Sequence, residues 1–236
     1  MPDLFGIFQN QAPKYDVLVS REDYQQNLLP ALTKITPFHG KRVVEFGAGT
    51  GRVTCLLAPI VESIVAFDSS DPMLKVVEEA LREQKLDNWR LAVADHRHVP
   101  AASGMAQIAI SGWSICCLAV YSGENWVRNL DEGLHEMKRV VEPDGMIVII
   151  ETLGTGFSSP HAPDGLKAYY GRLAEKGFRT TWIRTDYRFQ SMEEARDLTT
   201  FFFGYEPVAA IRNSQDGFVL PECTGIWWTS ADRLLL

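Results

Sequence analysis

Three glycines at alternate positions, Gly47, Gly49 and Gly51, follow an apolar, β-branched run in "VVEFGAGTGRVT", residues 43–54. Glycine permits a tight turn and a close approach of the backbone to a ligand, and a helix that follows presents unpaired amides. Two carboxylates, Asp68 and Asp95, end the next two apolar runs. Carboxylates at such strand ends accept hydrogen bonds from ribose hydroxyls. The combination predicts a nucleoside-binding site.

A nicotinamide-dependent oxidoreductase is a competing interpretation of this turn. The dinucleotide fingerprint G-x-G-x-x-G requires glycine at position 52, which is Arg52. The pattern is instead G-x-G-x-G, preceded by Glu45. Together with the second acid, Asp95, the spacing disfavours the oxidoreductase, and binding of NAD would test it.

A parallel sheet is the element that brings such residues together. Short, nearly continuous apolar runs are typical of strands covered on both faces, and they occur at 42–47, 63–68, 90–95, 106–112 and 145–151. Apolar residues at helical spacing predict helices at 70–86 and 126–141, the first with Pro72 in its opening turn. "EPDG", residues 142–145, predicts a turn between the second helix and the last of these strands. The fold class is therefore α/β.

The rest of the chain has a different pattern. Alternation over 180–189 predicts one strand with unequal sides. Ser191 and Glu194 form a capping-box pattern that opens a helix ending near Gly204. Residues 217–230 predict a last strand in which Pro221 marks an edge or a bulge. With no internal repeat or linker, a single domain is the simplest interpretation.

Five motifs in order resemble those of the class I, Rossmann-like S-adenosylmethionine-dependent methyltransferases: "EFGAGTG" at 45–51, "FDSSDPML" at 67–74, "VADHRHVP" at 93–100, "ISGWS" at 110–114 and "RVVEPDGMIVI" at 139–149. The resemblance implies a seven-stranded, mostly parallel sheet with helices on both faces and an antiparallel last strand. It also implies one domain over 1–236. Within it, 1–40 would form a helical lid or cap, 41–152 the cofactor-binding core, and 153–236 the strands and helices that complete the sheet and the acceptor pocket.

The same resemblance implies a cofactor site for S-adenosylmethionine, with S-adenosylhomocysteine as the product. Glu45 would lie near the cofactor's ammonium group, Asp68 would hold the ribose, and Asp95 would accept from the adenine amine. Met73 would pack on adenine, although simple core packing is an equal alternative. The complete expected set is Tyr15, Glu45, Gly47, Ala48, Gly49, Gly51, Asp68, Ser69, Met73, Asp95, His96, Ser111 and Gly112.

Aromatic residues outside these motifs predict an apolar pocket for the methyl acceptor. The expected lining is Trp113, Phe157, Phe201 and Phe202, with Phe203 beside them. No catalytic residue is assigned: His161 and Glu151 are candidates for a general base, and each has a structural or peripheral role as its alternative. The N-terminal segment, with Tyr15, either covers the site as a lid or packs on the sheet without gating.

Charge and cysteine usage limit the partners. The net charge of −7 argues against nucleic acid and anionic membranes, which require clustered Lys and Arg. Four cysteines without a CxxC spacing and the absence of a leader pattern predict a cytoplasmic protein with reduced thiols. His96 and His98 lack a third ligand at suggestive spacing, so no metal is expected.

The favoured function is methyl transfer from S-adenosylmethionine to a small, partly apolar metabolite by in-line displacement. A protein that binds the cofactor without catalysis, as a sensor or partner subunit, is the alternative. The methylated atom and the oligomeric state stay open.

Overall fold

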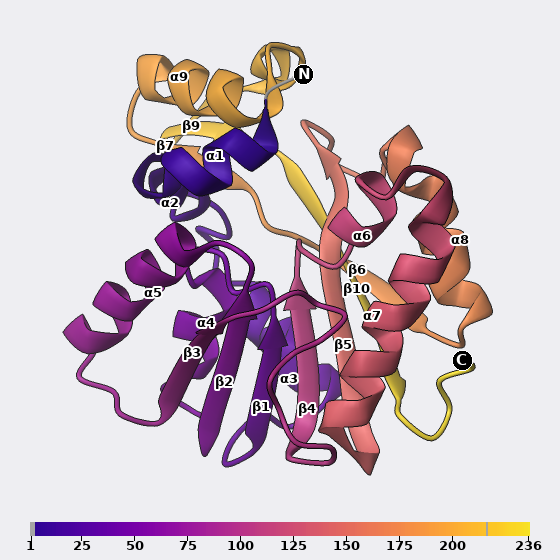
Figure 1. The fold of residues 1–236 in the computed structure, drawn as a ribbon. Coiled ribbons are helices and arrows are strands. Elements are labelled where there is room, and N and C mark those ends of the chain that lie inside the picture. Colours follow the sequence, from indigo (N-terminus) through magenta and orange to yellow (C-terminus); the bar gives the residue numbers. More distant parts are fainter. Residues whose placement is uncertain (1–2, 216) are drawn as a thin grey trace.

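The computed structural model describes residues 3–215 and 217–236, and a seven-stranded sheet forms their centre (Figure 1). The strand order is β3-β2-β1-β4-β5-β10-β6. The strands are β1 (Arg42–Phe46), β2 (Ser63–Asp68), β3 (Trp89–Val93), β4 (Ala106–Gly112), β5 (Val141–Thr155), β6 (Arg179–Arg184) and β10 (Glu222–Ser230). β10, the last strand of the chain, runs antiparallel to β5 and β6. The predicted α/β fold with a reversed last strand is confirmed.

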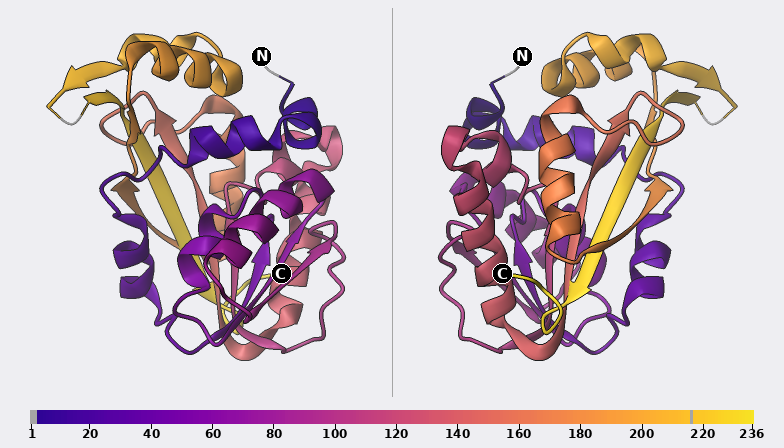
Figure 2. Two further views of the ribbon diagram at one scale, coloured as in Figure 1. Left: turned by 90° about the vertical axis from the view of Figure 1, so that its left-hand side faces the viewer. Right: turned by 90° about the vertical axis from the view of Figure 1, so that its right-hand side faces the viewer.

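Helices cover both faces of this sheet (Figures 1 and 2). Val43 of β1 packs with Leu32, Leu57 and Val77, whereas the next residue, Val44, packs in a separate cluster that includes Leu134. This alternation follows from the two-residue period of a strand. The first face carries α3 (Leu28–Ile35), α4 (Arg52–Leu57) and α5 (Asp71–Glu83); the second carries α7 (Trp126–Val140) and α8 (Lys167–Glu175), with η2 (Asp164–Leu166) before α8.

A third layer lies over the carboxyl ends of the strands (Figures 1 and 2). It contains α1 (Leu4–Asn10), α2 (Ala12–Val19), α9 (Met192–Phe203), η3 (Glu206–Ala210) and a small sheet of β7 (Tyr187–Phe189), β9 (Gly217–Leu220) and β8 (Arg212–Ser214). Its buried core includes Leu18, Phe189 and Leu198. Beside it, α6 (Cys117–Val120) and η1 (Gly123–Asn125) follow β4. The N-terminal segment therefore packs against the C-terminal part of the chain.

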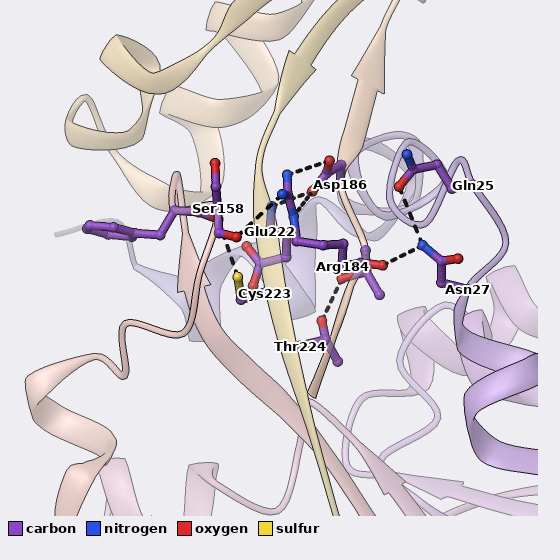
Figure 3. Close-up of polar contacts among 10 residues, drawn as sticks. Gln25, Asn27, Ser158, Arg184, Asp186, Glu222, Cys223 and Thr224 are labelled. Atoms are coloured by element: carbon purple, nitrogen blue, oxygen red, sulfur yellow. Dashed lines mark hydrogen bonds and ion pairs between the residues drawn. The ribbon is translucent and has the colours of Figure 1, made fainter. Parts of the chain in front are cut away.

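Polar contacts fasten the segment after α2 to the outer strands of the main sheet (Figure 3). The side-chain amide of Asn27 donates to the carbonyl oxygen of Arg184 at 2.9 Å. Arg184 pairs with Asp186, whose carboxylate also accepts from the backbone amide of Glu222 at 2.9 Å. These contacts hold the chain where it crosses from the sheet to the upper layer.

Three sequence-based boundaries are wrong. The predicted strand at 180–189 is two strands in different sheets, because Thr185 and Asp186 turn the chain between β6 and β7. The predicted last strand, 217–230, is likewise divided at Pro221, and β10 lies inside the sheet between β5 and β6. β5 starts at Val141, so 142–145 belongs to the strand, and the register of the β4–β5 pairing shifts beside it.

The cap of α9 is as predicted. The hydroxyl of Ser191 accepts from the backbone amide of Glu194 at 3.1 Å, and Gly204 ends the helix with a φ of 83°. Among the described residues, no helix is long and apolar enough to span a bilayer.

Candidate functional site

A cavity of about 640 Å³ opens at the carboxyl edge of the sheet, between the glycine turn, α1, α2 and α6. It brings together residues from five separate parts of the sequence. Of the residues expected to bind cofactor or acceptor, it is lined by Tyr15, Glu45, Gly47, Ala48, Gly49, Asp68, Ser69, Met73, Asp95, His96, Gly112 and Trp113. Carboxyl ends of parallel strands meet at one sheet edge, which explains the convergence.

The turn after β1 depends on glycine at two positions for different reasons. The amide of Gly47 donates to the carbonyl oxygen of Phe67 at 2.7 Å, and a Cβ atom at Gly47 would collide with Ser114 and press on His96. At Gly49, φ is +54° and a Cβ atom would meet no described atom closer than 4.0 Å, at Tyr15. Gly47 is therefore required for packing, whereas Gly49 leaves open space in the cavity.

Asp68 is fixed by two backbone amides at the end of β2. Its Oδ2 accepts from Gly49 at 2.8 Å and its Oδ1 accepts from Ser70 at 2.8 Å. The carboxylate retains further lone pairs for a ligand because each oxygen can accept more than one hydrogen bond. Asp68 thus joins the ends of β1 and β2 and faces the same cavity.

Asp95 and His96 form the cavity wall after β3. Hydrogen bonds and charge from Arg97 lower the pKa of Asp95 to about 2, so this carboxyl is ionised. The His96 ring nitrogen Nε2 lies 2.9 Å from the hydroxyl of Ser114, and burial lowers the pKa of His96. The other ring nitrogen, Nδ1, is buried without a hydrogen-bond partner among the described residues. The wall therefore presents one anion beside a neutral imidazole.

Glu45 lies at the floor of the cavity and is almost completely buried. The Thr54 hydroxyl donates to its Oε2 at 2.6 Å. Burial, with a smaller contribution from the charge of Asp68, raises the pKa of Glu45 to about 8. A cationic ligand near this group would favour its ionised form.

Sequence reasoning missed the role of Arg52 in this wall, because Arg52 entered only as a departure from the dinucleotide fingerprint. Its guanidinium carbon lies 3.3 Å from the ring centroid of Trp113, and it forms an ion pair with Glu22. Trp113 has a φ of 50°, uncommon for a bulky residue, at the end of β4. The sequence signal that could have pointed to Arg52 is its place at the start of a helix directly after the glycine turn.

Other expected residues lie elsewhere. Gly51 lines a neighbouring cavity of about 670 Å³, which shares Val19, Thr50, Arg52 and Trp113 with the first. Ser111 is fully buried and its hydroxyl accepts from the amide of Ile115 at 3.2 Å, outside the lining. The side chain of Ser111 is thus used to shape the loop after β4.

The expected acceptor residues are only partly brought together. Phe202 packs against Tyr15 with ring centroids 5.1 Å apart and the ring planes tilted by 50°, so it backs the cavity without lining it. Phe201 lies beside Lys14. Phe157 is 43% exposed and stacks on His161 at 3.9 Å, on the loop after β5. Neither Phe157 nor Phe201 lines the cavity.

Neither candidate general base reaches the cavity. Glu151 is buried beneath it, where its carboxylate accepts from the Tyr169 hydroxyl and the Cys116 amide, each at 3.1 Å, and burial raises its pKa to about 7. His161 lies on the exposed loop with Phe157. Within 3–215 and 217–236, no group of three or more His, Cys, Asp or Glu residues is arranged to hold a metal ion.

Comparisons with known proteins show which family and which solved structures this chain is similar to. Residues 44–149 match the family described as a methyltransferase domain. The chain is similar over 87% of its length to the YcgJ protein of Bacillus subtilis (15% identity, 97% of that chain, TM-score 0.55) and over 86% to a SAM-dependent methyltransferase of Aquifex aeolicus (14%, 88%, 0.54). These likenesses agree with the fold. The comparisons therefore relate the chain to the S-adenosylmethionine-dependent methyltransferases, by a domain match over 44–149 and by the fold.

Within this class, the curated relatives include enzymes of quinone biosynthesis. The chain is 28% identical to the ubiquinone/menaquinone biosynthesis C-methyltransferase UbiE of Teredinibacter turnerae over 70% of its length, and 30% identical to the demethylmenaquinone methyltransferase of Clavibacter sepedonicus over 67%. The matches span 63% and 59% of those two proteins. The chain therefore spans less than two thirds of the length of each of these two relatives.

Proposed function

We propose that the protein transfers a methyl group from S-adenosylmethionine to a small, partly apolar acceptor. The observation that carries this proposal is the single cavity in which the glycine turn and Asp68 face the aromatic residues Tyr15 and Trp113. The lining thus offers both polar partners for a nucleoside and an amino acid and apolar surface for an acceptor. Both reactants of a methyl transfer would be held within one enclosure.

The residues present fit the cofactor. The open space at Gly49 accommodates a ligand against the backbone, and Asp68 has lone pairs for ribose hydroxyls. Glu45 has a raised pKa that an ammonium group nearby would lower. The unpartnered Nδ1 of His96 leaves a buried polar atom for a ligand to satisfy. Of the remaining expected residues, Ala48, Ser69, Met73, Asp95 and Gly112 would complete the site from the same wall.

The bound cofactor supplies an activated methyl group on a sulfonium, so the protein's main tasks are alignment and exclusion of water. Trp113 and Tyr15 would orient the acceptor. The α1–α2 segment, held by the contact between the Tyr15 and Phe202 rings, would form the lid. Since Glu151 and His161 lie outside the cavity, we assign no general base to the chain.

A small acceptor is favoured over a macromolecule. The net charge is −7, and the cavity wall carries the acids Glu45, Asp68 and Asp95 against Arg52 and Arg97. Such a surface does not attract nucleic acid or anionic membranes. We propose one domain over 1–236, with 1–40 as the lid, 41–152 as the cofactor core and 153–236 completing the sheet and the acceptor side.

A labelling experiment tests this function. Purified protein is incubated with S-adenosylmethionine carrying a tritiated methyl group and with fractions of a cell extract: small molecules, RNA and protein. We expect counts in a small, partly apolar product and S-adenosylhomocysteine as coproduct. Calorimetry with S-adenosylhomocysteine, run in parallel, separates turnover from binding alone. Affinity without turnover in any fraction would favour the alternative of a sensor or partner subunit, and label in RNA or protein would contradict a small acceptor.

A further inference from the structure

Arg52 occupies the wall between the two cavities of the site. Both Arg52 and Trp113 line the cofactor-side cavity of about 640 Å³ and the neighbouring cavity of about 670 Å³. The guanidinium carbon lies 3.3 Å from the centroid of the Trp113 ring, so the cation covers the aromatic face. The Arg52 side chain is 18% exposed, which leaves part of it open to the cavities.

The position of this guanidinium is fixed from its other side by Glu22. Glu22, with a side chain only 1% exposed, pairs with Nη1 of Arg52. The same carboxylate accepts from the Tyr187 hydroxyl at 2.7 Å and from the Thr185 hydroxyl at 3.0 Å. Three segments of the chain thus converge on one buried ion pair. Arg52 is held in a defined place instead of extending freely into solvent.

The guanidinium retains donors for a ligand. An arginine side chain has five N–H groups. One of them, on Nη1 of Arg52, donates to the carboxylate of Glu22. The Arg52 side chain keeps 18% of its surface exposed and lines both cavities, so a ligand there can contact it. A guanidinium with free N–H groups in a partly enclosed, apolar wall is a strong partner for a carboxylate.

The acids beneath Arg52 do not cancel its charge. Glu151 and Glu222 are buried, and the pKa of each is raised to about 7, mainly by burial. Both carboxyls are therefore only partly ionised near neutrality, and Glu22 is the acid directly paired with Arg52. Other acids line the two cavities, Asp68 and Asp95 in the first and Asp16 and Asp23 in the second, so a ligand carboxylate would be attracted at the guanidinium and repelled along the rest of these walls.

We propose that Arg52 is a specificity residue of the acceptor site and binds a carboxylate carried by the acceptor. This inference rests on the proposed function. The acceptor class is a small molecule with an apolar body, which packs on Trp113 and Tyr15, and a carboxylate that acts as its handle and is not the methylated group. Hydrogen bonds from the guanidinium would orient the carboxylate of the acceptor, and the aromatic side chains would provide contact area for its apolar body.

Matched acids and amides test the inference on the protein loaded with S-adenosylhomocysteine. The probes are benzoate with benzamide, indole-3-acetate with indole-3-acetamide, and hexanoate with hexanamide, each titrated by calorimetry. We expect at least one acid to bind tenfold or more tightly than its amide. If no acid has this preference on protein that binds S-adenosylhomocysteine, the inference is wrong. If S-adenosylhomocysteine itself does not bind, it is the proposed function that fails.

Variants assign the preference to Arg52. In Arg52→Gln the preference for the acid should fall to less than twofold, with affinity for S-adenosylhomocysteine changed less than threefold. Arg52→Lys should retain part of the preference, because the charge remains and the planar fork is lost. If Glu22 left unpaired prevents folding, the double variant Glu22→Gln/Arg52→Gln removes both charges and replaces the single variant. Arg128→Gln, on the exposed face of α7, is the control and should keep the full preference. A preference that survives Arg52→Gln would overturn the assignment.

Discussion

The backbone amide of Gly49 donates a 2.8 Å hydrogen bond to Oδ2 of Asp68. The carboxylate expected to hold the cofactor's ribose therefore also fixes the glycine turn that would lie against the cofactor. The glycine turn and Asp68, on which the family resemblance rests, are thus hydrogen-bonded to each other. They meet because β1 and β2 are adjacent, parallel strands whose ends lie at the same edge of the sheet. A change at Asp68 should act on both.

Replacing Asp68 should weaken cofactor binding strongly. Asp68→Ala removes the acceptor for ribose hydroxyls and releases the Gly49 amide, so affinity for S-adenosylhomocysteine should fall by roughly 1–3 kcal/mol. Calorimetry measures the change, and thermal unfolding reports whether the variant is folded. Asp71→Ala, an exposed acid at the start of α5, is the control. An unchanged affinity in folded Asp68→Ala would refute the ribose assignment.

Three glycines with positive φ should respond differently to alanine. Gly40 (φ +66°) has no atom within 4 Å of a Cβ, so Gly40→Ala measures the backbone cost alone, about 1 kcal/mol of stability. Gly49→Ala adds a methyl group that enters the cavity, so it should weaken cofactor binding with a similar loss of stability. Gly47→Ala should be the least stable, because its Cβ meets Ser114. Gly49→Val should be worse than Gly49→Ala for binding.

Thermal unfolding and titration with S-adenosylhomocysteine separate these effects. If Gly49→Ala binds as tightly as the parent protein, the cofactor does not lie against this turn.

The stability of the protein should decrease as the pH rises because of Glu45. Burial raises the folded-state pKa of Glu45 from 4.5 to about 8, so the folded state binds a proton more tightly than the unfolded state. This contribution is favourable at low pH, decreases above pH 4.5 and is fully lost above about pH 8. Glu45→Gln should remove about 1–4 kcal/mol of that decrease. Urea unfolding at pH 5 and pH 8 measures it, with exposed Glu83→Gln as the control. An equal pH dependence in Glu45→Gln would contradict the raised pKa.

Methyl transfer should not require a divalent metal. The expectation rests on the His96–His98 pair, for which no third ligand had suggestive spacing. In the structure the Nε2 of His96 is engaged with Ser114 at 2.9 Å instead of pointing toward His98. Turnover measured after exhaustive treatment with a chelator should equal that of the untreated protein. Activity that is lost and returns only on addition of a metal would show that ligands were overlooked.

The cofactor half of the fold was predictable because its signals are local. Strands buried on both faces leave continuous apolar runs, and strand ends carry the acids, so the positions of Asp68 and Asp95 followed from sequence alone. The α9 cap at Ser191 was also local. The division of 180–189 was not, because alternation is the same whether the residues pair with β10 or with β9, and only tertiary packing decides between these partners.

The acceptor side was less predictable for the same reason. Phe157 and Phe201 are aromatic and follow elements of the core, yet composition does not reveal which aromatic residues face a cavity. The position of Arg52 depends on its contact with Glu22, thirty residues away, and Glu22 is in turn held by the hydroxyl of Tyr187. Such long-range contacts leave no periodic pattern in the sequence. Trp113 lines the cavity and directly follows β4, and its expected role toward the acceptor stays a prediction.

Trp113 should affect the acceptor far more than the cofactor. Its indole lines both cavities and lies on the Arg52 guanidinium, which is proposed to bind the acceptor. In Trp113→Ala, turnover of the acceptor should fall at least tenfold, while affinity for S-adenosylhomocysteine should change less than threefold. The positive φ of 50° adds a backbone effect, so Trp113→Gly should be at least as stable as Trp113→Ala with the same loss of turnover.

Trp182→Ala, at an exposed position on the edge strand β6, is the control and should leave both quantities unchanged. Acceptor kinetics in Trp113→Ala that match the parent protein would exclude this wall from the acceptor site, and an equal loss of cofactor affinity would place the indole against the cofactor instead.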